Sequence, residues 1–152
     1  MKNQITAKVS TNIKAPLAKV WEALTKPEII KQYFFGTEAN SEWKEGSPIT
    51  FKGEWNGQKY EDKGTILDIE PNKLFRYKYW SSMSGIEDKP ENYVTITYEL
   101  SEDINNITTK LSITQDNIPD EKMKEHSEQN WKIVLDNLKK LLEKQPAKPI
   151  EH

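Results

Sequence analysis

The order of the secondary-structure patterns constrains the fold more than any other feature of this chain. A strand pattern ends at Ile13-Lys14-Ala15-Pro16, and two short helix patterns follow over residues 17–24 and 29–34. Strand patterns then fill residues 37–113, and one amphipathic helix from Glu121 to Lys144 closes the chain. Strands that follow one another without intervening helices pair antiparallel. We therefore expect an α+β fold in which a curved antiparallel sheet of about six or seven strands grips the C-terminal helix.

The expected strands are recognised by the alternation of apolar and polar residues. In the first strand Ile5, Ala7 and Val9 share one face, which is the period of two of a half-buried strand. Asn56-Gly57 separates two such runs and favours a type I′ hairpin turn. Residues 81–92 show no alternation, so we expect a loop there. The other strands are expected at residues 37–43, 49–55, 59–70, 74–80, 93–100 and 107–113.

The helices carry their own start signals and an apolar stripe. Pro16 and Pro27 suit the first turn of a helix, and Thr25 and Glu28 have the spacing of a capping box. The stripe of the C-terminal helix consists of Met123, Ser127, Trp131, Val134, Leu138 and Leu141, with Asn130, Leu135 and Leu142 beside it. We expect residues 1–144 to form a single domain and residues 145–152, which hold two prolines, to form a flexible tail.

Composition excludes several classes of protein. The 152 residues suffice for one domain with a buried core. A net charge of -2 gives no electrostatic reason to expect nucleic acid or an anionic membrane as a partner. Cysteine is absent, which removes disulfides and thiolate chemistry. Neither a signal-peptide core nor a run of ~18 apolar residues is visible, so we expect a soluble cytoplasmic protein.

Motifs for catalysis and for metal binding are missing from the sequence. His126 and His152 are the only histidines, and neither has a second histidine at the spacing of a zinc site. Ser82-Met83-Ser84-Gly85 differs from the Gly-x-Ser-x-Gly elbow of a hydrolase. The sequence also contains no glycine-rich phosphate loop. We therefore expect no catalytic residues, no metal and no cofactor.

Charged residues on the expected strands leave one alternative open. Glu54, Asp62 and Asp68 could face inward as a general acid or base, although we favour the interpretation that all three point outward. Arg76 is the only arginine, and we expect it to pair with a carboxylate across the sheet rather than to bind a substrate.

The aromatic residues either fill the core or line a cavity for a guest. Burying Tyr77 and Tyr79 is favoured because it leaves Arg76 and Lys78 in water. Small or polar residues on the helix stripe either hydrogen-bond locally or leave room for a guest. The expected lining consists of Phe51, Trp55, Tyr77, Tyr79, Met83, Ile96, Tyr98, Met123, Ser127, Asn130, Trp131 and Val134. Met83 and Ile86, in the expected loop, are available as an apolar lid.

Both ends of the chain resemble one known superfamily. The run from Val9 to Glu28 resembles the opening of the START-like (SRPBCC) superfamily. The run from Asn130 to Glu143 is similar to the last helix of the branch related to the C-terminal domain of the heat-shock-protein-90 ATPase activator. The resemblance covers residues 3–144 and implies a helix-grip fold, with a hydrophobic ligand pocket in many relatives. That branch often carries Gly-Trp where this chain has Asn130-Trp131, so a side chain at residue 130 is expected to narrow the pocket.

We therefore expect a helix-grip protein, monomeric or weakly dimeric, that binds a small hydrophobic molecule without transforming it. Two alternatives stay open. One is a co-chaperone-like module with a chaperone partner, which an exposed and contiguous apolar patch would favour. The other is an enzyme that uses the same pocket for proton transfer or hydrolysis. Two inward carboxyl or hydroxyl groups within hydrogen-bond reach would favour the enzyme.

Overall fold

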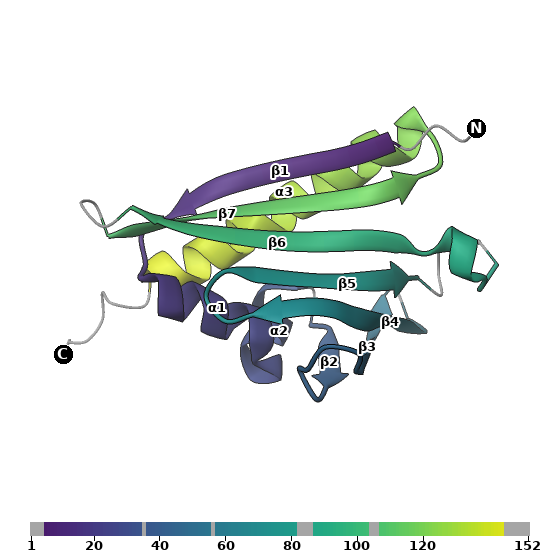
Figure 1. Ribbon diagram of the computed structural model, residues 1–152, viewed down its shortest axis with the longest axis horizontal. Helices are drawn as coiled ribbons and strands as arrows, with labels where there is room; N and C mark the ends of the chain where they lie inside the picture. The colour runs from purple at the N-terminus through teal and green to yellow at the C-terminus, as the bar shows by residue number, and fades with distance from the viewer. Residues whose placement is uncertain (1–4, 35, 56, 82–86, 104–106, 145–152) are drawn as a thin grey trace.

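A seven-stranded antiparallel sheet curves around a long C-terminal helix, α3 (Glu121–Lys144) (Figure 1). This computed structural model describes residues 5–34, 36–55, 57–81, 87–103 and 107–144. The strand order is β1-β7-β6-β5-β4-β3-β2, which places β1 at one edge of the sheet and β2 at the other. The expected α+β architecture is confirmed.

The bounds of the elements follow the predicted pattern closely. The strands are β1 (Ile5–Ile13), β2 (Glu38–Ser41), β3 (Pro48–Trp55), β4 (Gln58–Glu70), β5 (Leu74–Trp80), β6 (Val94–Asp103) and β7 (Thr108–Ile118). The helices besides α3 are α1 (Leu17–Thr25), α2 (Pro27–Tyr33) and a 3-10 turn, η1 (Pro90–Asn92). The strand expected over residues 37–43 is shorter, because Trp43 has a positive φ of 58° that extended backbone does not adopt. β6 and β7 both extend beyond the expected bounds at their C-terminal ends, to Asp103 and Ile118.

The hairpin between β3 and β4 is confirmed by the pairing of Trp55 with Gln58, which leaves two residues for the turn. Gly57 has a φ of 78°, as a type I′ turn requires. The prediction of a capping box formed by Thr25 and Glu28 is wrong. The residue before α2 is Lys26, and among the described residues no side chain caps the start of this helix. Thr25 Oγ1 donates instead to the carbonyl oxygen of Trp21, at 3.0 Å. Lys26 is extended (φ -113°, ψ 118°) because the following proline disfavours helical dihedrals there.

The core lies between the sheet and the three helices. α3 packs mainly against β1 and also touches β7, whereas α2 touches both β2 and α3. The fully buried side chains include Ile13, Val20, Phe75, Leu111 and Leu138, which come from strands and helices alike. Because α3 packs mainly on β1, aromatic side chains such as Phe51 of β3 and Tyr77 of β5 fill much of the core over the other strands.

Candidate ligand-binding site

Six aromatic rings from five elements or their ends meet on the inner face of the sheet. This aromatic cluster consists of Phe34, Phe51, Tyr77, Tyr79, Tyr98 and Trp131. Trp131 of α3 lies 6.1 Å from Tyr98 and 5.8 Å from Phe34, measured between ring centroids. Phe51 lies 5.8 Å from Tyr77 and 5.7 Å from Tyr79. These separations are typical of favourable edge-to-face and offset ring pairs.

The strand alternation explains why the tyrosines of β5 point inward. Tyr77 pairs with Ile66 on one side and Ile96 on the other, and all three side chains are buried. Their sequence neighbours face the other way, so Lys78 is exposed. Arg76 Nη1 lies 3.2 Å from Asp68 Oδ2, its cross-strand partner, which confirms the expected ion pair.

The rings place hydrogen-bonding groups inside an apolar region. The hydroxyls of Tyr77 and Tyr98 lie 3.2 Å apart, and Trp131 Nε1 donates to Gln115 Oε1 at 2.8 Å. Burial raises the pKa of Tyr98 to about 12 and the pKa of Tyr77 well above 10. Both hydroxyls therefore keep their protons at neutral pH and act as neutral hydrogen-bonding groups.

The interpretation that all three strand carboxylates point outward is wrong for Asp62. It lies on β4 opposite Phe51 and is 7% exposed, with its side chain on the inner face. Tyr79 donates its hydroxyl to Asp62 Oδ2 at 2.6 Å. Glu54 is exposed and Asp68 is half-buried, so the outward interpretation holds for Glu54 and is wrong for Asp62. Periodicity alone could have found Asp62, because it shares the parity of Ile66, but its charge argued against burial.

A second polar pair lies on the same face of β4. Tyr60 is two residues from Asp62, and its hydroxyl lies 2.6 Å from Thr37 Oγ1. A side chain at Gly53 would collide with the Tyr60 ring, so the missing Cβ makes room for that ring. Thr37 is buried and follows α2. Sequence analysis missed both residues, because their contact depends on the return of β2 beside β3 and on the β3–β4 pairing.

The helix side of the site differs from the expectation at two positions. Trp131 and Val134 are buried and Ser127 is half-buried, but Asn130 is exposed and Met123 is 36% exposed. The buried stripe of α3 runs through Trp131, Val134, Leu135, Leu138 and Leu142. Residue 130 precedes this stripe by about 100° of helix rotation, so its side chain reaches solvent and does not narrow the interior. Met83, Ile86 and the side chain of Trp55 lie outside the part of the chain that the structure describes.

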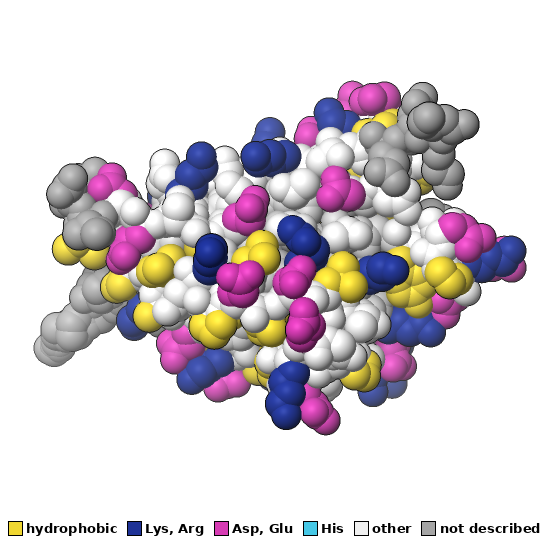
Figure 2. All heavy atoms as spheres, in the orientation of Figure 1, with side chains coloured by type: hydrophobic (Ala, Val, Ile, Leu, Met, Phe, Trp, Pro, Cys, Tyr) yellow, Lys and Arg dark blue, Asp and Glu magenta, His cyan; other side chains and the backbone are white. Residues whose placement is uncertain are grey.

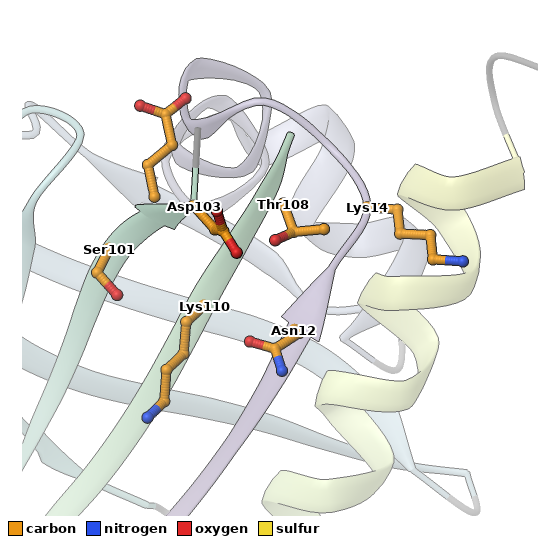
Figure 3. Close-up of a pocket in the computed structure, with 7 residues that line it drawn as sticks. Asn12, Lys14, Ser101, Asp103, Thr108 and Lys110 are labelled. Carbon is orange, nitrogen blue, oxygen red and sulfur yellow. The ribbon is translucent and has the colours of Figure 1, made fainter. Parts of the chain in front are cut away.

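A pocket of about 630 Å³ opens on the outer face of the sheet, away from the rings (Figure 3). Its lining is polar and consists of Asn12, Lys14, Ser101, Glu102, Asp103, Thr108 and Lys110. Asn12, Ser101 and Lys110 are register partners on β1, β6 and β7, and each alternates with buried residues of the core. The lining holds two lysines, two carboxylates and no hydrophobic residue, so this pocket offers a ligand no net charge.

The molecular surface mixes both charges with scattered apolar side chains on the face in view (Figure 2). Among the described residues, the large hydrophobic side chains that are exposed are Ile107, Met123 and Ile133. They lie apart, in the β6–β7 turn, the first turn of α3 and the middle of α3. These three side chains therefore do not form one continuous apolar patch of the kind that marks a protein interface.

Within the described ranges, no group of histidine, aspartate and glutamate side chains is arranged to hold a metal ion. None of the described helices is both long enough and apolar enough to cross a membrane.

Comparison with known proteins agrees with the fold. Residues 14–143 match the family described as Activator of Hsp90 ATPase homolog 1-like protein. No protein with curated annotation matches the chain. The solution structure of ChR145 from Cytophaga hutchinsonii is 47% identical, with a TM-score of 0.83, over 97% of this chain and 100% of that chain.

Two more distant structures share the fold. The Aha1 dimer from Colwellia psychrerythraea is 22% identical, with a TM-score of 0.72, over 91% of this chain and 96% of that chain. CalU16 from Micromonospora echinospora is 22% identical, with a TM-score of 0.67, over 90% of this chain and 82% of that chain. The family match and the likeness to ChR145 confirm the resemblance seen at the two ends of the sequence. The chain therefore belongs to the family of Activator of Hsp90 ATPase homolog 1-like proteins.

Proposed function

We propose that this protein binds a small, largely hydrophobic molecule between the sheet and α3 and does not transform it. The observation that carries this proposal is the aromatic cluster, which combines apolar rings with hydrogen-bonding groups in the interior. Ligand sites in proteins have this composition, with mostly apolar walls and a few placed polar groups.

The described rings touch one another, so a guest must displace a side chain to enter. Phe34 is suited to this movement because it is only half-buried and lies at the end of a short helix. It packs on Phe51 at 6.4 Å and on Trp131 at 5.8 Å, so its movement would expose both rings. A guest that removes ~300 Å² of apolar surface from water would gain roughly 7 kcal/mol before entropic losses, at about 25 cal/mol per Å². Binding in the micromolar range is consistent with that gain.

The binding proposal is tested with matched variants of α3. Ser127→Trp places a large ring on the half-buried side of the helix, whereas Asn130→Trp places the same ring at an exposed position. We expect Ser127→Trp to weaken binding of an apolar probe about tenfold or more and Asn130→Trp to leave it unchanged. Phe34→Ala should strengthen the binding of bulky probes. Equal affinities for the Ser127 and Asn130 variants would contradict the proposed position of the site.

Native mass spectrometry of protein purified from its own host provides an independent measurement. A retained guest would add mass to the folded protein, and denaturation would release that mass. Titration with an apolar fluorescent probe then gives the affinity. Absence of a retained guest together with absence of probe binding would refute the proposal.

An enzyme remains the second candidate because Asp62 and Tyr79 meet the criterion set from the sequence. Their oxygens lie 2.6 Å apart on the inner face, which is the arrangement of a general base and its partner. The raised pKa of Tyr79 makes this phenol a poor proton donor at neutral pH, which favours binding over proton transfer. Chemical analysis of the bound molecule separates the two functions, because an enzyme would release it altered.

The co-chaperone alternative has less support. The exposed large hydrophobic side chains of the described residues lie apart from one another, and the connection to a chaperone comes from the matched family. We expect this chain by itself to give little or no stimulation of a chaperone ATPase. A clear rise in ATP hydrolysis with stoichiometric protein would favour that function instead.

A further inference from the structure

Asp62 is unusual among the charged residues of this protein. Within the described ranges, it is the only charged side chain with less than a tenth of its surface exposed. Burial of a carboxylate carries a large desolvation cost unless other groups supply hydrogen bonds. A buried carboxylate therefore requires a physical reason, and here it lies beside the proposed ligand site.

The neighbours of Asp62 place its carboxylate at one end of the aromatic cluster. Its cross-strand partner is Phe51, whose ring packs against Tyr77 and Tyr79. Tyr79 comes from the adjacent strand and reaches Asp62 with its hydroxyl. Tyr60, on the same face of β4, contributes to the surroundings of the Tyr79 hydroxyl. The carboxylate thus lies on the inner face of the sheet, beside the rings of β3 and β5.

The hydrogen bond from Tyr79 shows that Asp62 acts as an acceptor at this end of the cluster. Its length of 2.6 Å falls within the range of O–H···O⁻ bonds. Burial, followed by the nearby Asp62 charge, raises the pKa of Tyr79 well above 10. The phenol therefore remains the donor of this pair at neutral pH, and Asp62 remains the acceptor.

We propose that Asp62, oriented by Tyr79, is the polar anchor of the site and accepts a hydrogen bond from a hydroxyl or ammonium group on the guest. This inference rests on the proposed binding function and specifies the chemical class of the ligand. A carboxylate offers about four acceptor positions, so Asp62 can accept from a donor on the guest in addition to Tyr79 and its other neighbours. A guest that carries its own carboxylate is disfavoured, because like charges repel strongly in an interior of low dielectric constant. Fatty acids are therefore poor ligands, and apolar alcohols, phenols and amines are good ones.

Four probes of one shape test the anchor with the full chain. They are 4-butylphenol, 4-butylbenzylamine, butylbenzene and 4-butylbenzoate, and their affinities are measured by calorimetry at pH 7. We expect the phenol and the amine to bind about tenfold more tightly than butylbenzene, in line with a hydrogen bond to a charged acceptor. The benzoate should bind most weakly of the four. This ranking is measured on the unaltered protein, so it does not depend on the folding of any variant.

Asp62→Asn removes the charge at nearly constant shape and should abolish the preference for the amine and the discrimination against the benzoate. Glu54→Gln is the matched control, since it neutralises an exposed carboxylate on the adjacent strand. It should leave the ranking unchanged. Equal affinities for all four probes, or an unchanged ranking in Asp62→Asn, would overturn the anchor while leaving ligand binding intact. Absence of binding by every probe and of any retained guest would overturn both proposals.

Discussion

At the scale of single residues, two glycines show how backbone crowding sets the sheet. A Cβ at Gly64 would overlap the backbone carbonyl oxygen of Lys78 on β5, whereas the atoms nearest to a Cβ at Gly53 belong to the side chain of Tyr60. The backbone of a paired strand cannot yield without breaking its ladder, but a tyrosine ring can rotate away. Glycine is thus required for different reasons at the two positions.

This difference gives a direct stability prediction. We expect Gly64→Ala to lower the free energy of unfolding by about 3 kcal/mol or more, because β4 and β5 must separate locally. Gly53→Ala should cost about 1 kcal/mol, since Tyr60 can move at the loss of its contact with Thr37. Urea denaturation of the two variants measures the difference. Equal losses of stability would show that the approach of β4 to β5 is not what requires glycine at residue 64.

At the scale of elements, α3 protects the exposed edge of β1. Strand β1 is nine residues long and forms one edge of the sheet in the described part of the chain. Such an edge invites pairing with another chain. Glu143 Oε2 accepts from the backbone N–H of Lys14 at 2.9 Å, and Lys139 Nζ donates to the carbonyl oxygen of Asn12 at 2.6 Å. Side chains of the helix thus form hydrogen bonds with backbone groups at the C-terminal end of the edge strand.

The pKa of Glu143 makes this protection sensitive to acid. The hydrogen bond from Lys139, and then the one from the Lys14 backbone, lowers the pKa of Glu143 below 4.5. A lowered folded-state pKa contributes stability that is fully present above the unfolded value and is lost as the pH falls through the folded value.

We therefore expect Glu143→Gln to cost about 0.5–1 kcal/mol at pH 7 and much less at pH 3, where the native glutamate is becoming protonated. Glu125→Gln, on an exposed face of α3, is the matched control and should have little effect at either pH. Thermal unfolding at both pH values measures the stabilities. A loss of the same size at pH 3 and pH 7 would contradict the ionic origin of the contact.

At the scale of the whole molecule, the buried phenols predict a loss of stability in alkali. Burial raises the pKa values of Tyr33, Tyr77 and Tyr79 well above 10 and that of Tyr98 to about 12. In the unfolded chain these phenols ionise near pH 10. The stabilisation is therefore complete below pH 10 and is lost as the pH rises toward 12.

Tyr98→Phe tests this coupling, since phenylalanine keeps the ring and removes the proton. The variant should lose about 1 kcal/mol at pH 7, because Tyr77 loses its hydroxyl partner. Between pH 10 and pH 12 its stability should fall less steeply than that of the unaltered protein. Unfolding by urea at a series of pH values provides both slopes. Identical slopes would show that Tyr98 already ionises in the folded state as it does in the unfolded chain.

Local pattern determined most of the fold. The alternation in β1, the two-residue turn before β4 and the apolar stripe of α3 each depend on neighbours within a few residues, and all three were predicted. The inward tyrosines of β5 followed from the same alternation, because the opposite choice would bury Arg76 and Lys78. The helix start before α2 was predicted incorrectly, since the extended residue required by Pro27 displaced the expected cap.

Tertiary structure decided which groups surround the polar part of the site. The charge of Asp62 argued for an outward position, and only the register of β3, β4 and β5 placed this carboxylate beside Phe51 and within reach of Tyr79. In the same way, the packing of α3 against the sheet buried Trp131 and left Asn130 exposed. Sequence patterns specify which face of an element is apolar, because that face follows from the local period. Contacts between elements depend on register and on rotation, which neither strand nor helix determines by itself.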